Sequence, residues 1–135
     1  MNDRREFLKT AALAATTLTL ASTGVAFASP PENLTNIIYT ADNPGKWEKK
    51  VGLHTPQVTI TGSTVAIATK HPMSEDHYIV RHTLVMQDGT VVGATTFTPA
   101  DKPESSYELP AGYKGKIYAT SFCNLHDFWL SEATV

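Results

Sequence analysis

The chain has 135 residues, with 11 lysines and arginines against 13 aspartates and glutamates, and a formal net charge of −2. This length excludes several large domains. The slight excess of acidic residues does not favour binding to nucleic acid or to an anionic membrane, because such surfaces need clustered basic charge. We therefore expect one small domain with no nucleic-acid partner.

The N-terminus has the features of an export signal in their usual order. Arg4 and Arg5 are adjacent, residues 10–21 are uncharged and rich in alanine and leucine, and Ala26-Phe27-Ala28 provides a small-x-small cleavage site. The apolar stretch is too short for a stable transmembrane span. The sequence thus predicts a twin-arginine signal peptide over residues 1–28 and a mature domain over residues 29–135. It also predicts a periplasmic location and no membrane span in the mature form.

Cys123 is the only cysteine, so an intramolecular disulfide is excluded. Small exported domains that use cysteine structurally normally carry disulfides. A single thiol in an oxidising compartment is a liability unless it is buried, reactive or bound to a metal. Twin-arginine export carries folded proteins, often with a cofactor already inserted, and this favours the metal.

The mature sequence reads as short strands separated by turn residues, without a convincing helix. Gly62-Ser63 and Asp88-Gly89 each join two alternating segments, as expected for hairpins. Residues 29–36 and 41–53 are rich in proline and glycine and are expected to form an arm and a loop. The predicted strands cover residues 57–61, 64–69, 77–86, 90–97, 105–109, 116–122 and 128–134. In the third of them Tyr78, Val80, Leu84 and Met86 are expected to share one face.

Strands of this length and spacing favour an all-β fold. We expect an immunoglobulin-like antiparallel β-sandwich or barrel of seven to eight strands.

Four histidines and the cysteine lie where predicted strands begin or end. They are His54, His71, His77, Cys123 and His126, and they can converge at one end of a sandwich. Four imidazoles and a thiolate form a nitrogen-rich, partly soft donor set that suits iron or copper and would also hold zinc. Zinc usually takes four ligands, so five donors favour iron. His82 lies in mid-strand outside any motif, and we expect it to be structural or on the surface.

Three apolar residues are expected to surround this site. Met73 should pack beneath it, and Phe128 and Trp129 should shield the sulfur, since an apolar shell tunes metal–thiolate sites.

These motifs resemble the superoxide reductase family, which includes the neelaredoxins and desulfoferrodoxins. The resemblance rests on His71-Pro72-Met73 with His77 six residues after His71, and on Cys123-Asn124-x-His126 before an aromatic residue. It covers roughly residues 46–132. The chain lacks the four further cysteines of two-iron members and therefore resembles the one-iron type.

The resemblance implies a mononuclear non-haem iron in an immunoglobulin-like domain. His54, His71, His77 and His126 would be equatorial ligands and Cys123 the axial ligand. Superoxide would be reduced to hydrogen peroxide at the open sixth position. A small redox protein, rubredoxin-like or a cytochrome, would supply the electron. The oligomeric state is left open, with a homo-oligomer as one alternative.

The sequence departs from the family directly before the first histidine. Family members usually have Glu-Lys there, where the glutamate closes the oxidised site and the lysine assists superoxide. Here Gly52-Leu53 occupies these positions, and the nearest charged residues are Glu48, Lys49 and Lys50. One hypothesis is that residues 47–53 fold back and present Lys49 or Lys50 over the metal. The other is that these are solvated loop charges.

Two other functions are compatible with parts of the sequence. A cupredoxin-like electron carrier also uses a Cys-x-x-His loop, but such loops usually continue to an axial methionine, and no methionine follows His126. That function would also leave His54 and His71 unexplained. A relative that binds metal without catalysis is the second alternative, because the Glu-Lys pair is missing.

Overall fold

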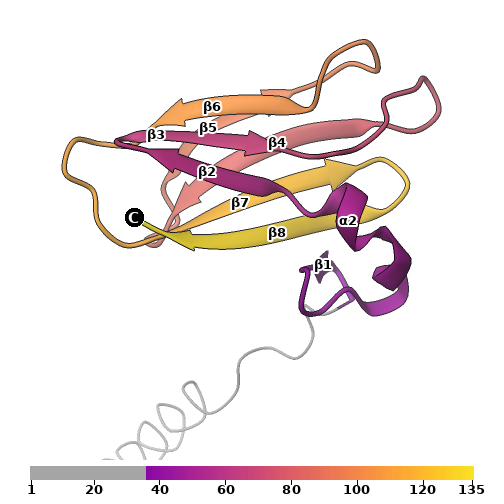
Figure 1. Cartoon of the computed structure of the whole chain (residues 1–135), viewed down its shortest axis with the longest axis horizontal. Coiled ribbons are helices and arrows are strands. Elements are labelled where there is room, and N and C mark those ends of the chain that lie inside the picture. Colours follow the sequence, from indigo (N-terminus) through magenta and orange to yellow (C-terminus); the bar gives the residue numbers. More distant parts are fainter. Residues whose placement is uncertain (1–35) are drawn as a thin grey trace, which may run out of the picture. The chain divides into compact units, whose positions relative to one another are not determined.

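A computed structural model describes residues 36–135, and the predicted signal peptide lies outside them. Two sheets pack face to face (Figure 1). One has five strands in the order β1-β8-β7-β4-β5, and the other has three in the order β2-β3-β6. This confirms the predicted all-β sandwich of seven to eight strands. The elements are β1 (Ile38–Tyr39), η2 (Gly45–Lys50), α2 (Val51–His54), β2 (Gln57–Thr61), β3 (Thr64–Ala68), β4 (Ile79–Met86), β5 (Val91–Thr96), β6 (Glu104–Glu108), β7 (Lys116–Cys123) and β8 (Asp127–Thr134).

The strands follow from alternating apolar residues joined by tight turns. In β7 every second residue from Ile117 to Cys123 is buried, as expected where one face of a strand meets the core. The β2–β3 and β4–β5 hairpins turn at Gly62 and Gly89, whose φ angles are 61° and 89°. Glycine adopts this left-handed conformation without the steric cost of a side chain. Both hairpins were expected at these positions.

The expected face of β4 is wrong at its first residues. A bulge between Ile79 and Arg81 shifts the register against β7, so the buried side chains are those of Ile79, His82 and Leu84. A bulge places two residues opposite one and reverses the inward and outward positions before it. Val80 is therefore not on the face that carries Leu84.

The chain before β2 also differs from the expected arm and loop. Residues 45–54 form the short helices η2 and α2, and Ile38–Tyr39 forms a two-residue strand. This strand pairs parallel with β8, so that Tyr39 lies opposite Trp129 and their ring centroids are 5.8 Å apart. α2 lies beside the β7–β8 turn at one end of the sandwich (Figure 1). Among residues 36–135, no helix is long and apolar enough to cross a bilayer.

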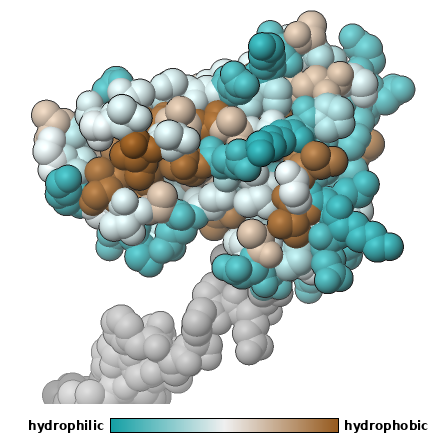
Figure 2. Space-filling view, in the orientation of Figure 1, coloured by the Kyte–Doolittle hydropathy of each residue, from teal (hydrophilic) through white to brown (hydrophobic). Residues whose placement is uncertain are grey.

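The core lies between the sheets and has two clusters of buried side chains. The larger contains Val65, Ile67, Leu84 and Ile117, and the smaller contains Ile79, Phe97 and Cys123. Figure 2 shows a hydrophobic band between the sheets and mainly hydrophilic side chains around the end that carries α2. The cysteine is thus part of the core, and its sulfur is reached from the end of the sandwich.

His82 joins the two sheets through hydrogen bonds and is fully buried. Its Nε2 lies 2.8 Å from the Thr69 hydroxyl and its Nδ1 lies 2.9 Å from the Ser105 hydroxyl. Burial lowers the pKa of His82 to about 4, so the ring is neutral at pH 7. Of the two expectations for His82, the structural one is correct.

Candidate metal centre

Five side chains from four parts of the chain meet at the end of the sandwich. His54 ends α2, His71 and His77 lie between β3 and β4, Cys123 ends β7, and His126 lies in the turn that leads to β8. One nitrogen or sulfur atom of each lies within 4.8 Å of all the others. The convergence predicted from the positions of these residues at strand ends is therefore present.

The four imidazoles are arranged as a square. His126 Nδ1 lies 3.0 Å from His54 Nε2 and 3.0 Å from His77 Nε2, and His77 Nε2 lies 3.0 Å from His71 Nε2. Ring centroids along the four edges are 4.4–4.7 Å apart, whereas the His54–His77 diagonal measures 5.9 Å. Neighbouring rings are close to perpendicular, so each points one nitrogen toward a shared centre.

The sulfur of Cys123 lies to one side of this square. Its Sγ is 3.8 Å from His71 Nε2 and 3.6 Å from His126 Nδ1, and these two nitrogens occupy opposite corners. An atom at similar distances from opposite corners lies near the axis through the centre. Cys123 is fully buried and His77 and His126 are only half-buried, so the face opposite the sulfur is directed away from the core.

These distances fit a bound transition metal. Four nitrogens in a square around an ion at a bond length of ~2.1 Å would be ~3.0 Å from their neighbours. The observed edges of 3.0 Å match this value. Four imidazoles and one thiolate also form a donor set for a first-row metal rather than for calcium or magnesium, which prefer oxygen. The residues therefore fit a five-donor metal site with an axial sulfur.

The protonation of the cluster suits ligation by the imidazoles. Burial is the largest cause that lowers the pKa of His54 and of His71 to about 4 in each case, and neighbouring histidines lower both further. Burial also lowers the pKa of His126. These rings are therefore neutral at pH 7 and have a free lone pair. Burial raises the pKa of the Cys123 thiol, so a metal must displace a proton when it binds sulfur.

Local contacts hold the ligand-bearing segments in place. Ser74 and His77 form an isolated β-bridge, which turns the chain so that His71 and His77 face each other. The Lys50 carbonyl lies 3.0 Å from His54 Nδ1 and directs Nε2 toward the cluster. The indole N–H of Trp129 donates to the His126 carbonyl at 2.9 Å.

The three apolar neighbours differ in their positions. Met73 packs against the cluster that contains Cys123, as expected, and its sulfur accepts the Ile79 N–H at 3.3 Å. Trp129 is fully buried and its ring centroid lies 5.7 Å from that of His54, so it shields the site. Phe128 does not shield it, because it is 45% exposed and stacks on Phe122.

The three charged candidates are not equivalent. Glu48 and Lys49 are exposed, whereas Lys50 is half-buried. After burial and the His77 charge, the Lys50 ammonium is a further cause that lowers the pKa of His126. It acts in the same direction on His71. Of the three, Lys50 is the charge that the cluster senses.

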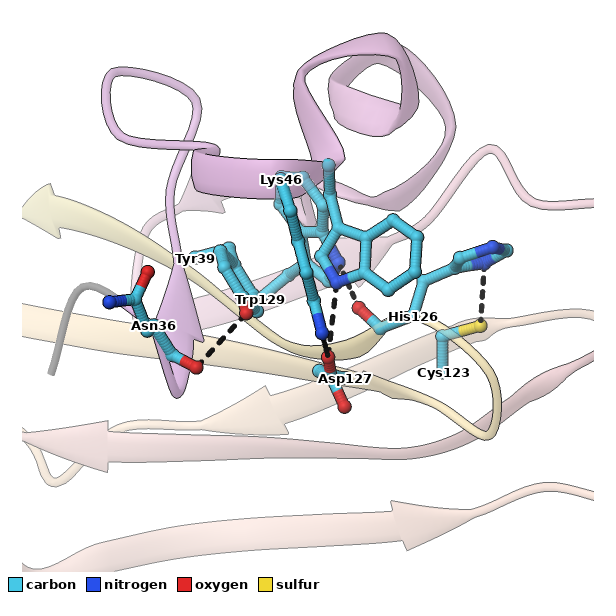
Figure 3. A network of polar contacts seen from close by, with 8 residues as sticks. Asn36, Tyr39, Lys46, Cys123, His126, Asp127 and Trp129 are labelled. Carbon is cyan, nitrogen blue, oxygen red and sulfur yellow. Dashed lines mark hydrogen bonds and ion pairs between the residues drawn. The ribbon is translucent and has the colours of Figure 1, made fainter.

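Trp47 and Asp127 also contact the cluster, although neither was expected to. The Trp47 ring meets the His126 ring edge to face with centroids 4.6 Å apart, and its N–H donates to Asp127 Oδ2 at 3.0 Å. Figure 3 shows Asp127 directly below Lys46 and next to the turn that carries His126. The position of Asp127 directly after a candidate ligand was the only available sequence signal.

Comparison with known proteins gives one family. Residues 45–132 match the family model described as desulfoferrodoxin. A superoxide reductase of Pyrococcus abyssi is 34% identical over 71 residues, which are 46% of this chain and 62% of the relative. A desulfoferrodoxin of Nitratidesulfovibrio vulgaris is 36% identical over 83 residues, which are 59% of this chain and 62% of the relative. The chain thus spans about 62% of the length of these curated relatives.

Solved structures have the same fold. A superoxide reductase (neelaredoxin) of Ignicoccus hospitalis aligns with a TM-score of 0.68 at 24% identity, over 77% of this chain and 97% of that chain. A one-iron superoxide reductase of Giardia intestinalis aligns with a TM-score of 0.55 at 26% identity, over 61% of this chain and 97% of that chain.

Proposed function

Because the chain belongs to the desulfoferrodoxin family, we propose that it is a superoxide reductase with one mononuclear iron. The observation that carries the proposal is the square of four imidazole nitrogens with the Cys123 sulfur on its axis. His54, His71, His77 and His126 would hold the iron in the plane, and Cys123 would hold it from the core side. Ferrous iron at this position supplies one electron, which with two protons converts superoxide to hydrogen peroxide.

Iron suits this donor set better than zinc or copper. Zinc has no redox chemistry, so it cannot supply the electron. Blue-copper sites use two histidines and one cysteine, with a weak axial ligand. Here four histidines point to one centre, which leaves two of them without a role in a copper carrier.

The protein's own groups select the substrate and protect the sulfur. Cys123 is fully buried among Ile79 and Phe97, which keeps water and oxidants from its sulfur. The opposite face is directed toward solvent, from which a small anion and protons can arrive. A cation at that face would favour the approach of superoxide and stabilise the reduced product.

An electron carrier is the second candidate, since the Cys-x-x-His turn and the small β-sandwich are common to both classes. Product analysis separates them. The ferrous protein mixed with superoxide should yield hydrogen peroxide as the iron is oxidised. A carrier would leave superoxide to decay at the rate seen with buffer alone.

We propose Lys50 as the residue that provides positive charge near the open face. Lys50→Ala should lower the second-order rate constant for superoxide about tenfold at low ionic strength, because a nearby cation steers and concentrates a small anion. The effect should diminish as salt screens the charge. Pulse radiolysis over a series of salt concentrations measures this.

Lys49→Ala is the matched control, because Lys49 is a neighbouring lysine of η2 that is exposed. It should react at nearly the parental rate, and so should Glu48→Gln. A Lys50→Ala rate equal to that of the parent at low salt would exclude the role of this lysine.

We also propose that the electron comes from a small redox protein, rubredoxin-like or a cytochrome, in the periplasm. Two exposed leucines support this, because Leu53 and Leu125 directly precede the candidate ligands His54 and His126 and are 48% and 54% exposed. Apolar side chains at the rim of a redox site favour transient docking of a partner. Cell fractionation tests the location, and recovery of the protein in the cytoplasm would contradict it.

A further inference from the structure

The segment that carries His54 has little local support of its own. η2 and α2 comprise six and four residues, and η2 has no buried side chain and no side-chain cap. Helices this short are unstable without tertiary contacts. The other candidate ligands lie in β7, in the turn to β8, and in the connection that leads into β4. His54 alone comes from a segment without sheet pairing.

Trp47 and Asp127 connect this segment to the ligand turn. Trp47 belongs to η2, and Asp127 directly follows His126. The Trp47 indole N–H donates to Asp127 Oδ2 at 3.0 Å, and the same ring packs edge to face on His126. One contact between two side chains therefore joins the segment of His54 to the turn of His126, whose nitrogens form one edge of the square.

Lys46 contributes less to this connection. Its ammonium lies 3.6 Å from Asp127 Oδ2, but the two side chains are 64% and 46% exposed (Figure 3). Ion pairs with this exposure contribute little to stability. The hydrogen bond from Trp47 is better protected and accepts into a charged carboxylate, which makes it the stronger of the two contacts.

The backbone at Asp127 is consistent with a requirement for this side chain. Asp127 has φ of 66° and is the only residue other than glycine with a positive φ among residues 36–135. Glycine would adopt this conformation at lower cost, although aspartate tolerates it better than most residues. A carboxylate thus stands where the backbone alone would favour glycine.

We propose that Asp127 is a positioning residue that, through Trp47, holds His54 in register with His126 and so slows loss of the metal. The inference rests on the proposed iron centre and adds a residue that touches neither metal nor substrate. Partners that orient metal ligands in this way affect metal affinity by about tenfold or more.

The test measures iron release from the oxidised full-length protein to a strong chelator at neutral pH. Trp47→Phe and Asp127→Gly should each release iron about tenfold faster than the parent. The double variant should be no faster than the single variants, because both remove the same contact. Asp127→Asn retains an oxygen acceptor and should restore most of the parental rate. Glu132→Gln, which removes the β8 partner of Lys116, should behave like the parent.

Melting of the metal-free proteins gives a second readout. Asp127→Gly suits the backbone, so it should fold and melt near the parental temperature while it still loses iron quickly. Parental release rates in Trp47→Phe and Asp127→Gly would overturn the inference, as would single effects that multiply in the double variant. A parent that binds no iron would instead overturn the proposed function, and the two failures are therefore distinguishable.

Discussion

Replacing Cys123 with serine should abolish the visible absorption band of the oxidised protein. A thiolate on ferric iron gives a sulfur-to-metal charge-transfer band, and a serine oxygen lacks the soft donor orbital that produces it. Cys123 is the only cysteine of the chain, and its Sγ lies 3.6–3.8 Å from opposite corners of the histidine square. Visible spectra of the two oxidised proteins, with matched iron content, measure the effect.

Met73→Leu is the matched control for this experiment. Met73 is the other sulfur-containing residue packed into the same small cluster, but its sulfur accepts the Ile79 N–H. The Met73→Leu protein should keep the band. A Cys123→Ser protein that retains the band at parental intensity would show that the sulfur is not a ligand.

Replacing His77 with alanine should reduce the iron content to a small fraction of the parental value. His77 Nε2 lies 3.0 Å from the nitrogens of both His71 and His126, so its loss removes one corner of the square and breaks two of its edges. The half-buried position of His77 makes a folding defect a minor cause. Elemental analysis of the purified proteins, in iron atoms per chain, gives the result.

His82→Gln serves as the comparison for His77→Ala. His82 is fully buried and bonded to Thr69 and Ser105, and it is the one histidine outside the cluster. A glutamine keeps hydrogen-bonding capacity at that position, so this protein should fold and contain iron at the parental level. Equal loss of iron from both variants would show that the assignment of ligands is wrong.

Much of the fold could be predicted from the sequence because its strands are locally encoded. Apolar residues alternate in β3 and β7, and Gly62 and Gly89 mark two of the hairpins. The two-residue β1 could not be predicted, since Ile38 and Tyr39 owe their conformation to pairing with β8 rather than to a local pattern. The face of β4 was wrong because the bulge near Arg81 is set by pairing with β7.

The candidate ligands could be predicted because residue type and position at strand ends were both informative. His54 is the exception, since it lies on helices that were expected to be a loop. Gly45 and Gly52 weaken any local helical signal, and the segment is held by contacts with the sandwich. Its contact with Asp127 joins residues far apart in the sequence, so no local pattern could reveal it.

The charged residues before His54 show the same limit. Glu48, Lys49 and Lys50 are adjacent and were equal candidates on sequence alone. The helical turn exposes Glu48 and Lys49 and leaves Lys50 half-buried and close enough to affect His126. Distinguishing among them requires the backbone geometry of residues 45–54.

The stoichiometry of product formation tests the central claim most directly. Excess ferrous protein is mixed with a limiting amount of superoxide without dioxygen, and hydrogen peroxide and dioxygen are both measured. The iron-free His77→Ala protein serves as the blank for spontaneous dismutation. A superoxide reductase should form one hydrogen peroxide and oxidise one iron for each superoxide consumed, with no dioxygen released. One hydrogen peroxide for every two superoxide ions, with release of dioxygen and no net oxidation of the iron, would contradict the account.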